Sequence, residues 1–233
     1  LPSYFFGTSV AMSGQTVVVG TKYAGAAYVF VKPYSGWSGN FTETAKLIAS
    51  AGKVSDEFGC SVGISGSTVV VGANYASKAY VYVEPSTGWP ESMTETARLF
   101  ATDVMQRHRF GHSVAISGNT AVVGADGVPS FGGLVAQGAA YVFVEPGSGW
   151  PQTMTETAKL TASDGAIGAY FGASVASAGD VDGDGYADVL AGTRLYDGPE
   201  VNEGRASLYR GYASTLGQTS AWGFEADQAG AEV

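Results

Sequence analysis

The sequence predicts an all-β protein built from repeated small sheets, and three observations support this prediction. A Phe-Gly pair opens a short strand four times in the 233 residues, at Phe6-Gly7, Phe58-Gly59, Phe110-Gly111 and Phe171-Gly172, with spacings of 52, 52 and 61. Glycine is abundant, with 34 residues, and only 14% of residues are charged, as expected for short strands and tight turns. Long windows lack the 3.6-residue periodicity of helices. Such a repeat is typical of a β-propeller with four-stranded antiparallel blades.

The first repeat shows why four strands are expected in each blade. Runs rich in β-branched and aromatic residues, bounded by Gly, Pro, Ser and Asn, are the signal of a strand. They predict strands at Phe6–Met12, Thr16–Gly20, Ala26–Lys32 and about Thr42–Ala49. The second strand is a continuous apolar run, which indicates that both of its faces are covered by neighbouring blades. The fourth alternates more between polar and apolar residues, which predicts an outer edge strand.

Up-and-down connectivity assigns the loops to two faces. Loops joining the first to the second strand and the third to the fourth lie on one face. Loops joining the second to the third, and the linkers between repeats, lie on the other. The glycine after each phenylalanine is expected to let backbones approach closely near a crowded axis. We expect residues 1–233 to form one propeller domain or part of a larger ring, with repeats at about 1–52, 53–104, 105–165 and 166–233.

Repeat 4 carries an insert in its first turn. The first three repeats advance 13 residues from the Phe-Gly glycine to the glycine that ends the second strand, whereas repeat 4 advances 20, from Gly172 to Gly192. Ca²⁺ takes about six to eight oxygen ligands in flexible geometry. The insert supplies closely spaced carboxylates and, at Gly185, a residue suited to a sharp turn. The predicted ligands are Asp180, Asp182, Asp184, Asp188 and the backbone carbonyl of Tyr186.

The insert is not an EF-hand. An EF-hand places Glu at position 12 of the loop, and here that position is Ala191, inside a predicted strand. A calcium loop within a β-hairpin is therefore expected, with one structural ion. An Asp- and Gly-rich turn without an ion is the alternative, but clustered carboxylates repel one another unless something neutralises them. Mg²⁺ is less favoured because it requires tighter octahedral geometry.

Two loops on the face opposite the insert are longer than their counterparts. They are Asp126–Gln137 in repeat 3 and Arg194–Glu203 in repeat 4. Long loops on a rigid scaffold are where binding usually occurs, although neutral drift in loop length explains them equally well. The candidate binding residues are Phe131, Leu134, Tyr196, Asp197 and Glu200.

Charge and motifs argue against several classes of function. The net charge is −9 and no basic stripe is visible, which argues against nucleic-acid binding. Neither membrane insertion nor a zinc, phosphate-loop or CxxC motif is indicated. His112 and Ser113 are neighbours in a predicted strand, so their side chains point to opposite faces and cannot form a catalytic pair. The single cysteine, Cys60, is expected to be a buried, inert thiol, and no enzymatic activity is expected.

The Phe-Gly openings, the Gly72-Ala73 and Gly124-Ala125 pairs and the Asp-x-Asp-x-Asp-Gly-x-x-Asp loop together resemble FG-GAP repeats. These repeats form the propeller at the N-terminus of integrin α subunits and occur in many bacterial surface proteins. The resemblance covers the whole chain and implies calcium binding by the same five insert residues and an extracellular or cell-surface location. The chain departs from it in lacking the calcium loop in repeats 1–3 and the Pro of Gly-Ala-Pro, and in having four repeats where seven blades are common.

We therefore expect a non-enzymatic extracellular calcium-binding propeller module for protein adhesion or assembly. The alternatives are a lectin-like propeller that binds glycans on its loop face and a purely structural module of an extracellular fibre or large surface protein. The Gly-Trp turns at Trp37, Trp89 and Trp150 resemble sugar-stacking platforms, but their regular recurrence favours a packing role beneath each blade. The expected partner is a protein or like subunits, with a glycan as the alternative. The sequence does not decide whether four blades close into a ring alone, whether two chains form an eight-bladed ring, or whether the chain belongs to a longer array.

Overall fold

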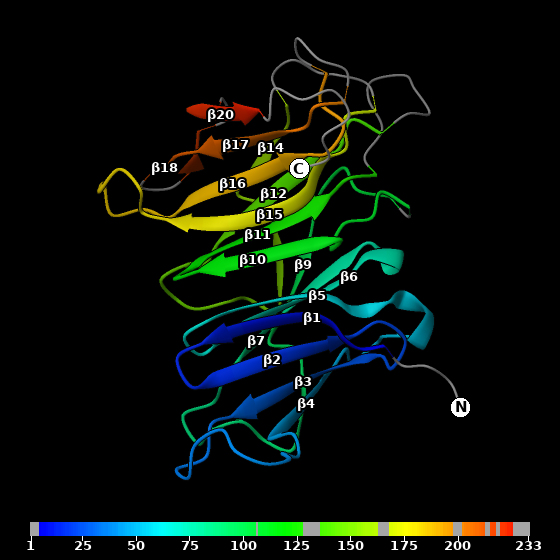
Figure 1. Ribbon diagram of the computed structural model, residues 1–233, viewed down its shortest axis with the longest axis vertical. Helices are drawn as coiled ribbons and strands as arrows, with labels where there is room; N and C mark the ends of the chain where they lie inside the picture. Colours follow the sequence, from blue (N-terminus) through cyan, green and yellow to red (C-terminus); the bar gives the residue numbers. More distant parts are fainter. Residues whose placement is uncertain are drawn as a thin grey trace.

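The computed structural model describes residues 5–105, 107–127, 136–162, 168–197, 202–212, 215–217 and 220–225. It confirms the all-β prediction, with four sheets of four or five strands that follow one another as propeller blades (Figure 1). The only helical elements in the described residues are two 3₁₀ turns, η1 (Val54–Asp56) and η2 (Asn74–Ala76). None of the described helices is long and apolar enough to span a membrane.

Each blade is an antiparallel sheet whose four strands run in sequence order. Blade 1 contains β1 (Phe6–Ser13), β2 (Thr16–Thr21), β3 (Ala26–Val31) and β4 (Ala45–Ile48). Blade 2 contains β5 (Phe58–Ser65), β6 (Thr68–Ala73), β7 (Lys78–Val83) and β9 (Ala97–Phe100). Blade 3 contains β10 (Ser113–Ser117), β11 (Thr120–Ala125), β12 (Ala139–Val144) and β14 (Ala158–Leu160). Blade 4 contains β15 (Phe171–Gly179), β16 (Asp188–Thr193), β17 (Arg205–Tyr209) and β20 (Trp222–Glu225).

Two short strands cross from one repeat to the blade before it. β8 (Ser92–Thr94) of repeat 2 pairs in parallel with β4 of blade 1, and β13 (Thr153–Thr155) of repeat 3 pairs in parallel with β9 of blade 2. The prediction that the fourth strand is an outer edge was therefore wrong for blades 1 and 2. The Thr-Glu-Thr-Ala segment holds two strands, because it covers the edge of the preceding blade before it returns to its own.

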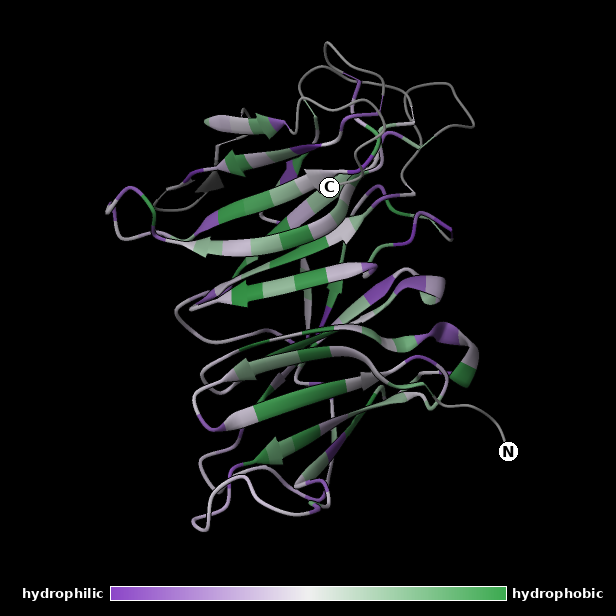
Figure 2. Cartoon of the chain, in the orientation of Figure 1, coloured by the Kyte–Doolittle hydropathy of each residue, from purple (hydrophilic) through white to green (hydrophobic). Residues whose placement is uncertain are grey.

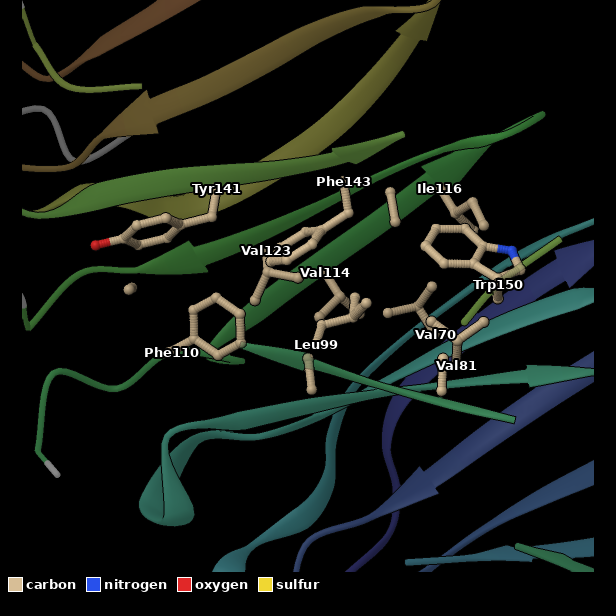
Figure 3. Close-up of a cluster of buried hydrophobic side chains, with 14 of the residues drawn as sticks. Val70, Val81, Leu99, Phe110, Val114, Ile116, Val123, Tyr141, Phe143 and Trp150 are labelled. Atoms are coloured by element: carbon tan, nitrogen blue, oxygen red, sulfur yellow. The ribbon is translucent and has the colours of Figure 1, made fainter. Parts of the chain in front are cut away.

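The hydrophobic core lies between neighbouring blades. One cluster joins Val18, Val29 and Leu47 of blade 1 to blade 2, and a similar cluster joins blade 3 to blade 4. Figure 3 shows the cluster between blades 2 and 3, where Val81 and Leu99 lie on the side of blade 2 and the other labelled side chains come mainly from blade 3. Because blades 2 and 3 are covered on both sides, β6 and β11 are buried along their whole length, which confirms the prediction from their continuous apolar runs.

The glycine of the Phe-Gly pair permits the close approach that the sequence predicted. Gly59, Gly111 and Gly172 have φ angles of +88°, +89° and +80°, a conformation that favours glycine. A Cβ atom at Gly111 would lie 2.3 Å from the backbone oxygen of Lys78 in the preceding blade. Such contacts leave no room for a side chain.

The loops divide between two faces as up-and-down connectivity requires. In Figure 1 the β1–β2 and β15–β16 turns lie on the left of the molecule, and η1 and η2 lie on the right. The first face therefore carries the insert of repeat 4, and the second carries the linkers between repeats. In this open array β5 and β10 lie between β1 and β15 (Figure 1).

Candidate functional site

The insert of repeat 4 forms a loop between β15 and β16 that Asp180 organises from its start. Its Oδ1 accepts hydrogen bonds from the backbone N–H groups of Gly183 (2.7 Å) and Asp184 (3.0 Å), and its Oδ2 accepts one from Gly185 (2.8 Å). Gly183 and Gly185 have φ angles of +78° and +91°, which side-chain-bearing residues rarely adopt. Aspartate and glycine at these spacings therefore fold the loop back on itself.

Asp188 fixes the far end of the loop. It is fully buried at the start of β16, where Oδ2 accepts a hydrogen bond from the backbone of Val181 at 2.7 Å. Its Oδ1 accepts another from the backbone of Gly211 at 2.8 Å. Gly211 begins the short strand β18 (Gly211–Tyr212). The loop is thus tied to the blade through a carboxylate that water does not reach.

Three of the predicted carboxylates converge. Asp180, Asp182 and Asp188 each offer one oxygen, and these atoms lie within 4.8 Å of one another. Asp184 is not part of this group. Its Oδ1 accepts a hydrogen bond from the backbone N–H of Tyr186 at 2.9 Å. Asp180 and Asp182 are exposed, and Figure 2 shows hydrophilic residues along this loop. The ligand roles of Asp184 and of the Tyr186 carbonyl stay predictions.

The donor set of this loop fits a hard divalent cation. All of the candidate ligands are oxygens, as Ca²⁺ prefers, and soft sulfur or imidazole ligands are absent from the described cluster. A carboxylate has about four lone-pair positions, so backbone hydrogen bonds to Asp180 and Asp188 leave capacity for an ion. Exposure of Asp180 and Asp182 also leaves room for water ligands.

Arg210 is a charged neighbour of the loop that sequence reasoning missed. Its Nε lies 3.3 Å from Oδ2 of Asp182. Arg210 directly follows β17, at the position that Val31, Val83 and Val144 occupy in the other repeats. The sequence signal for this neighbour was the replacement of valine by arginine at the position opposite Asp188. One arginine offsets only one of the four aspartate charges, so the loop keeps a negative balance that favours a cation.

The opposite face contains an open cleft of about 890 Å³ that the sequence did not predict. It is built by short loops and linkers of repeats 1–3, including η1 and η2. Its lining includes two acidic and five basic side chains, in a protein whose net charge is −9. The charged residues are Lys22, Lys53, Asp56, Glu57, Lys78, Arg107 and Arg109. They are scattered over nearly ninety residues of sequence, so only folding gathers them.

The predicted binding residues are only partly described. Phe131, Leu134 and Glu200 lie outside the described residues. Tyr196 is half-buried with the Arg205 guanidinium 5.0 Å from its ring centre, and Asp197 accepts a hydrogen bond from the backbone of Asn202 at 2.7 Å. Their role in binding therefore stays a prediction.

Asp126 holds the base of the long loop of repeat 3. It is buried and forms an ion pair with Arg109, whose Nη1 lies 2.8 Å from its Oδ2. The Nε2 atom of His112 lies 3.8 Å from the same oxygen. Burial lowers the pKa of His112, outweighing the opposite effect of Asp126. This end of the loop is therefore joined to the residues that precede β10.

Residues that could suggest catalysis or sugar stacking have packing roles. The hydroxyl of Ser113 donates to the carbonyl of Gly172 at 2.9 Å, not to a histidine. Burial raises the pKa of the Cys60 thiol, as expected for an inert group. Trp89 and Trp150 are each only 8% exposed, whereas Trp37 is 41% exposed. Two of the three tryptophans thus lie under neighbouring blades, where they offer no platform for a sugar.

Fold and site together define a repeat-built propeller with one acidic loop. The chain matches the family model of the FG-GAP repeat over residues 41–83, 93–143 and 154–209. These segments cover more than half of the chain, which therefore belongs to the FG-GAP repeat family. A comparison with curated proteins gave no match. Members of this family are typically non-catalytic adhesion-type propeller modules of extracellular or surface proteins.

Proposed function

We propose that the chain is a non-enzymatic extracellular module that binds one Ca²⁺ through the loop at 180–188 and serves protein adhesion or assembly. The observation that carries this proposal is the convergence of Asp180, Asp182 and Asp188 within 4.8 Å. A bound Ca²⁺ would offset the carboxylate charge without taking part in a reaction. Asp188 would transmit this stabilisation, because its side chain joins the loop to β16 and β18.

Calcium is expected to raise the stability of blade 4. An ion that binds only the folded state stabilises it by about 2.7 kcal/mol when its concentration is one hundred times Kd. Wild-type protein should therefore melt at a higher temperature in calcium than in EDTA, and titration calorimetry should show one site. The Asp182→Asn variant should lose most of this difference while folding normally in EDTA, since Asp182 is exposed.

The control for this experiment is Glu91→Gln, which removes one exposed carboxylate far from the loop. It should keep the full response to calcium. Identical melting temperatures of the wild-type protein in calcium and in EDTA, together with no heat of binding, would contradict the calcium site.

The cleft lined by η1 and η2 is the proposed contact surface for an acidic segment of a protein partner. Lys22 already pairs with Glu57 at 3.3 Å, and Arg109 pairs with Asp126. Lys53, Lys78 and Arg107 line the same cleft. Positive charge in a concave surface attracts acidic ligands and accelerates their association. The buried positions of Trp89 and Trp150 give the glycan alternative no comparable support.

A charge-reversal experiment tests this surface. A fluorescent Glu-rich peptide should bind the wild-type protein in a salt-dependent manner, and the Lys53→Glu/Arg107→Glu double variant should bind it at least tenfold more weakly, as measured by anisotropy. Lys32→Glu/Lys46→Glu makes the same charge change away from this cleft. Equal weakening in both double variants would show nonspecific attraction and contradict a site in the cleft.

A further inference from the structure

The same joint connects each blade to the next. A serine near the start of one blade donates its hydroxyl to the carbonyl of the Phe-Gly glycine of the following blade. These bonds are Ser9 to Gly59 (2.9 Å), Ser61 to Gly111 (2.8 Å) and Ser113 to Gly172 (2.9 Å). We call the Phe-Gly pair the plug. The socket is the serine together with the glycine opposite it on the second strand.

The socket glycine leaves the space that the plug occupies. Each serine pairs in register with this glycine, as Ser9 does with Gly20. A Cβ atom added to the socket glycine would clash with the carbonyl oxygen of the plug. The separations are 2.1 Å at Gly20, 2.0 Å at Gly72 and 2.1 Å at Gly124. Only glycine can therefore occupy this position when a plug is seated.

Blade 4 has the same socket with no plug among the described residues. Ser174 pairs in register with Gly192. Its hydroxyl lies 2.3 Å from the position of a Cβ on Gly192, compared with 2.2 Å in each of the other three sockets. The three atoms nearest to that Cβ position all belong to Ser174, whereas the carbonyl oxygen of a plug is the nearest atom in the other three sockets. The hydroxyl thus already points as it does in an occupied socket.

Blade 1 has the same plug with no described socket around it. Gly7 has a φ angle of +89°, as the seated plugs do, yet nothing lies within 4 Å of a Cβ built on it. Phe6 is 60% exposed, whereas Phe58, Phe110 and Phe171 are at most 1% exposed. The apolar face around it is also open, since Val10 and Met12 are 67% and 62% exposed and their counterparts Val62 and Ile64 are 8% exposed.

In repeat 1, the segment that corresponds to the crossing strands has no preceding blade in the described structure with which to pair. Residues 40–42 correspond to β8 and β13, but they form no strand and are exposed. Glu43 corresponds to Glu95, which accepts hydrogen bonds from the backbone and hydroxyl of Ser50 in the preceding blade at 2.8 and 2.7 Å. No described residue hydrogen-bonds to the Glu43 side chain. The exposed plug, the open apolar face around Val10 and Met12, and the unpaired segment at 40–42 thus all fit a blade of the same kind packed against blade 1.

We propose that a second copy of this chain docks head to tail, with its Phe6-Gly7 plug in the Ser174–Gly192 socket. The occupant follows from the chain itself, because three seated joints show what each half receives and the free halves lie at opposite ends of one array. The face of blade 4 that points away from blade 3 presents Leu190, Trp222 and Phe224, and the last two are 56% and 45% exposed. Two such contacts, related by a twofold axis, would close two arrays into one eight-bladed ring.

The mass of the protein in solution tests this inference, which does not depend on calcium binding. Sedimentation or light scattering should give twice the chain mass of 23.8 kDa over a range of concentrations. Phe6→Asp, which charges the plug, and Gly192→Val, which fills the socket, should each give single chains with native circular dichroism. Phe6 is 60% exposed, so Phe6→Asp should not prevent folding. Gly192 itself is buried, so native circular dichroism of Gly192→Val is the check that blade 4 remains folded. Tyr75→Asp, at an equally exposed aromatic in η2, should leave the mass unchanged.

The outcomes separate this arrangement from its competitors. A mass of one chain at every concentration would overturn the inference. Loss of the dimer in Phe6→Asp but not in Gly192→Val would show a symmetric contact between two plug faces and would also overturn it. Growth beyond two copies would exclude ring closure. An equal mixture of the two variants should regain part of the dimer, since it restores one of the two joints.

Discussion

The residue before each plug adopts a left-handed backbone conformation that its side chain does not explain. Phe5, Glu57, Arg109 and Tyr170 have φ angles of 45°, 57°, 59° and 57°. Four different side chains share this conformation, so the backbone of the joint imposes it. Local propensity could not predict this, because positive φ is normally expected at glycine or asparagine. The neighbouring glycine was predictable, since the Phe-Gly pair recurs.

Gly111→Ala should destabilise the protein strongly. Its φ angle of +89° disfavours any side chain, and the added Cβ would lie 2.3 Å from the Lys78 oxygen. Left-handed strain costs about 1–2 kcal/mol and overpacking about 1–3 kcal/mol, so urea unfolding should show a loss of about 2–5 kcal/mol.

Gly7→Ala is the matched control for this prediction. Gly7 has the same φ angle but an open surrounding, so at concentrations where chains are single it should show the strain alone. Equal losses in the two variants would contradict a steric contribution from the joint.

At the scale of elements, the sequence predicted the strands of each blade but not where the fourth segment pairs. The Thr-Glu-Thr-Ala segments of repeats 2 and 3 give β8 and β13 parallel partners in the preceding blade. A period-two pattern looks the same whichever blade supplies the partner, so the crossing could not be seen locally. In the insert, by contrast, spacing alone placed Asp180, Asp182 and Asp188 together, because backbone hydrogen bonds within a short loop set their positions.

Acid should weaken the crossing segment that contains Glu95. Burial alone would raise the pKa of Glu95, but hydrogen bonds from Ser50 and Arg98 outweigh it and lower this pKa below its usual value. The stabilisation is therefore complete above the ordinary pKa of glutamate, about 4.3, and is lost as pH falls through the lower pKa of the folded state. The free energy of unfolding should accordingly decrease as pH falls below about 4.

Glu95→Gln should remove part of this pH dependence. Urea unfolding in EDTA at pH 7 and pH 3.5 should give a smaller difference for Glu95→Gln than for the wild-type protein. Glu43→Gln changes the equivalent glutamate, which has no described hydrogen-bond partner, and should behave as the wild type does. A full pH dependence retained in Glu95→Gln would contradict the assignment.

At the scale of the whole molecule, the repeat predicted the blades, their order and the two loop faces. It could not predict the basic cleft, because five separated cations meet only when linkers from three repeats are placed together. Nor could it predict the open array. Phe6 and Phe58 occupy the same place in the motif, and their exposures of 60% and 1% differ only through what lies beside them.

The crossing strands have a consequence for how the array comes apart. Because β8 belongs to repeat 2 but completes the sheet of blade 1, the unit of sequence and the unit of structure are offset from each other. A protease cut in the linker at 50–57 would sever the chain without freeing blade 1, whose outer edge remains hydrogen-bonded to residues beyond the cut. Neighbouring blades should therefore unfold in pairs, in the nearest-neighbour manner of stacked repeats. Fraying would begin at whichever end lacks a neighbour.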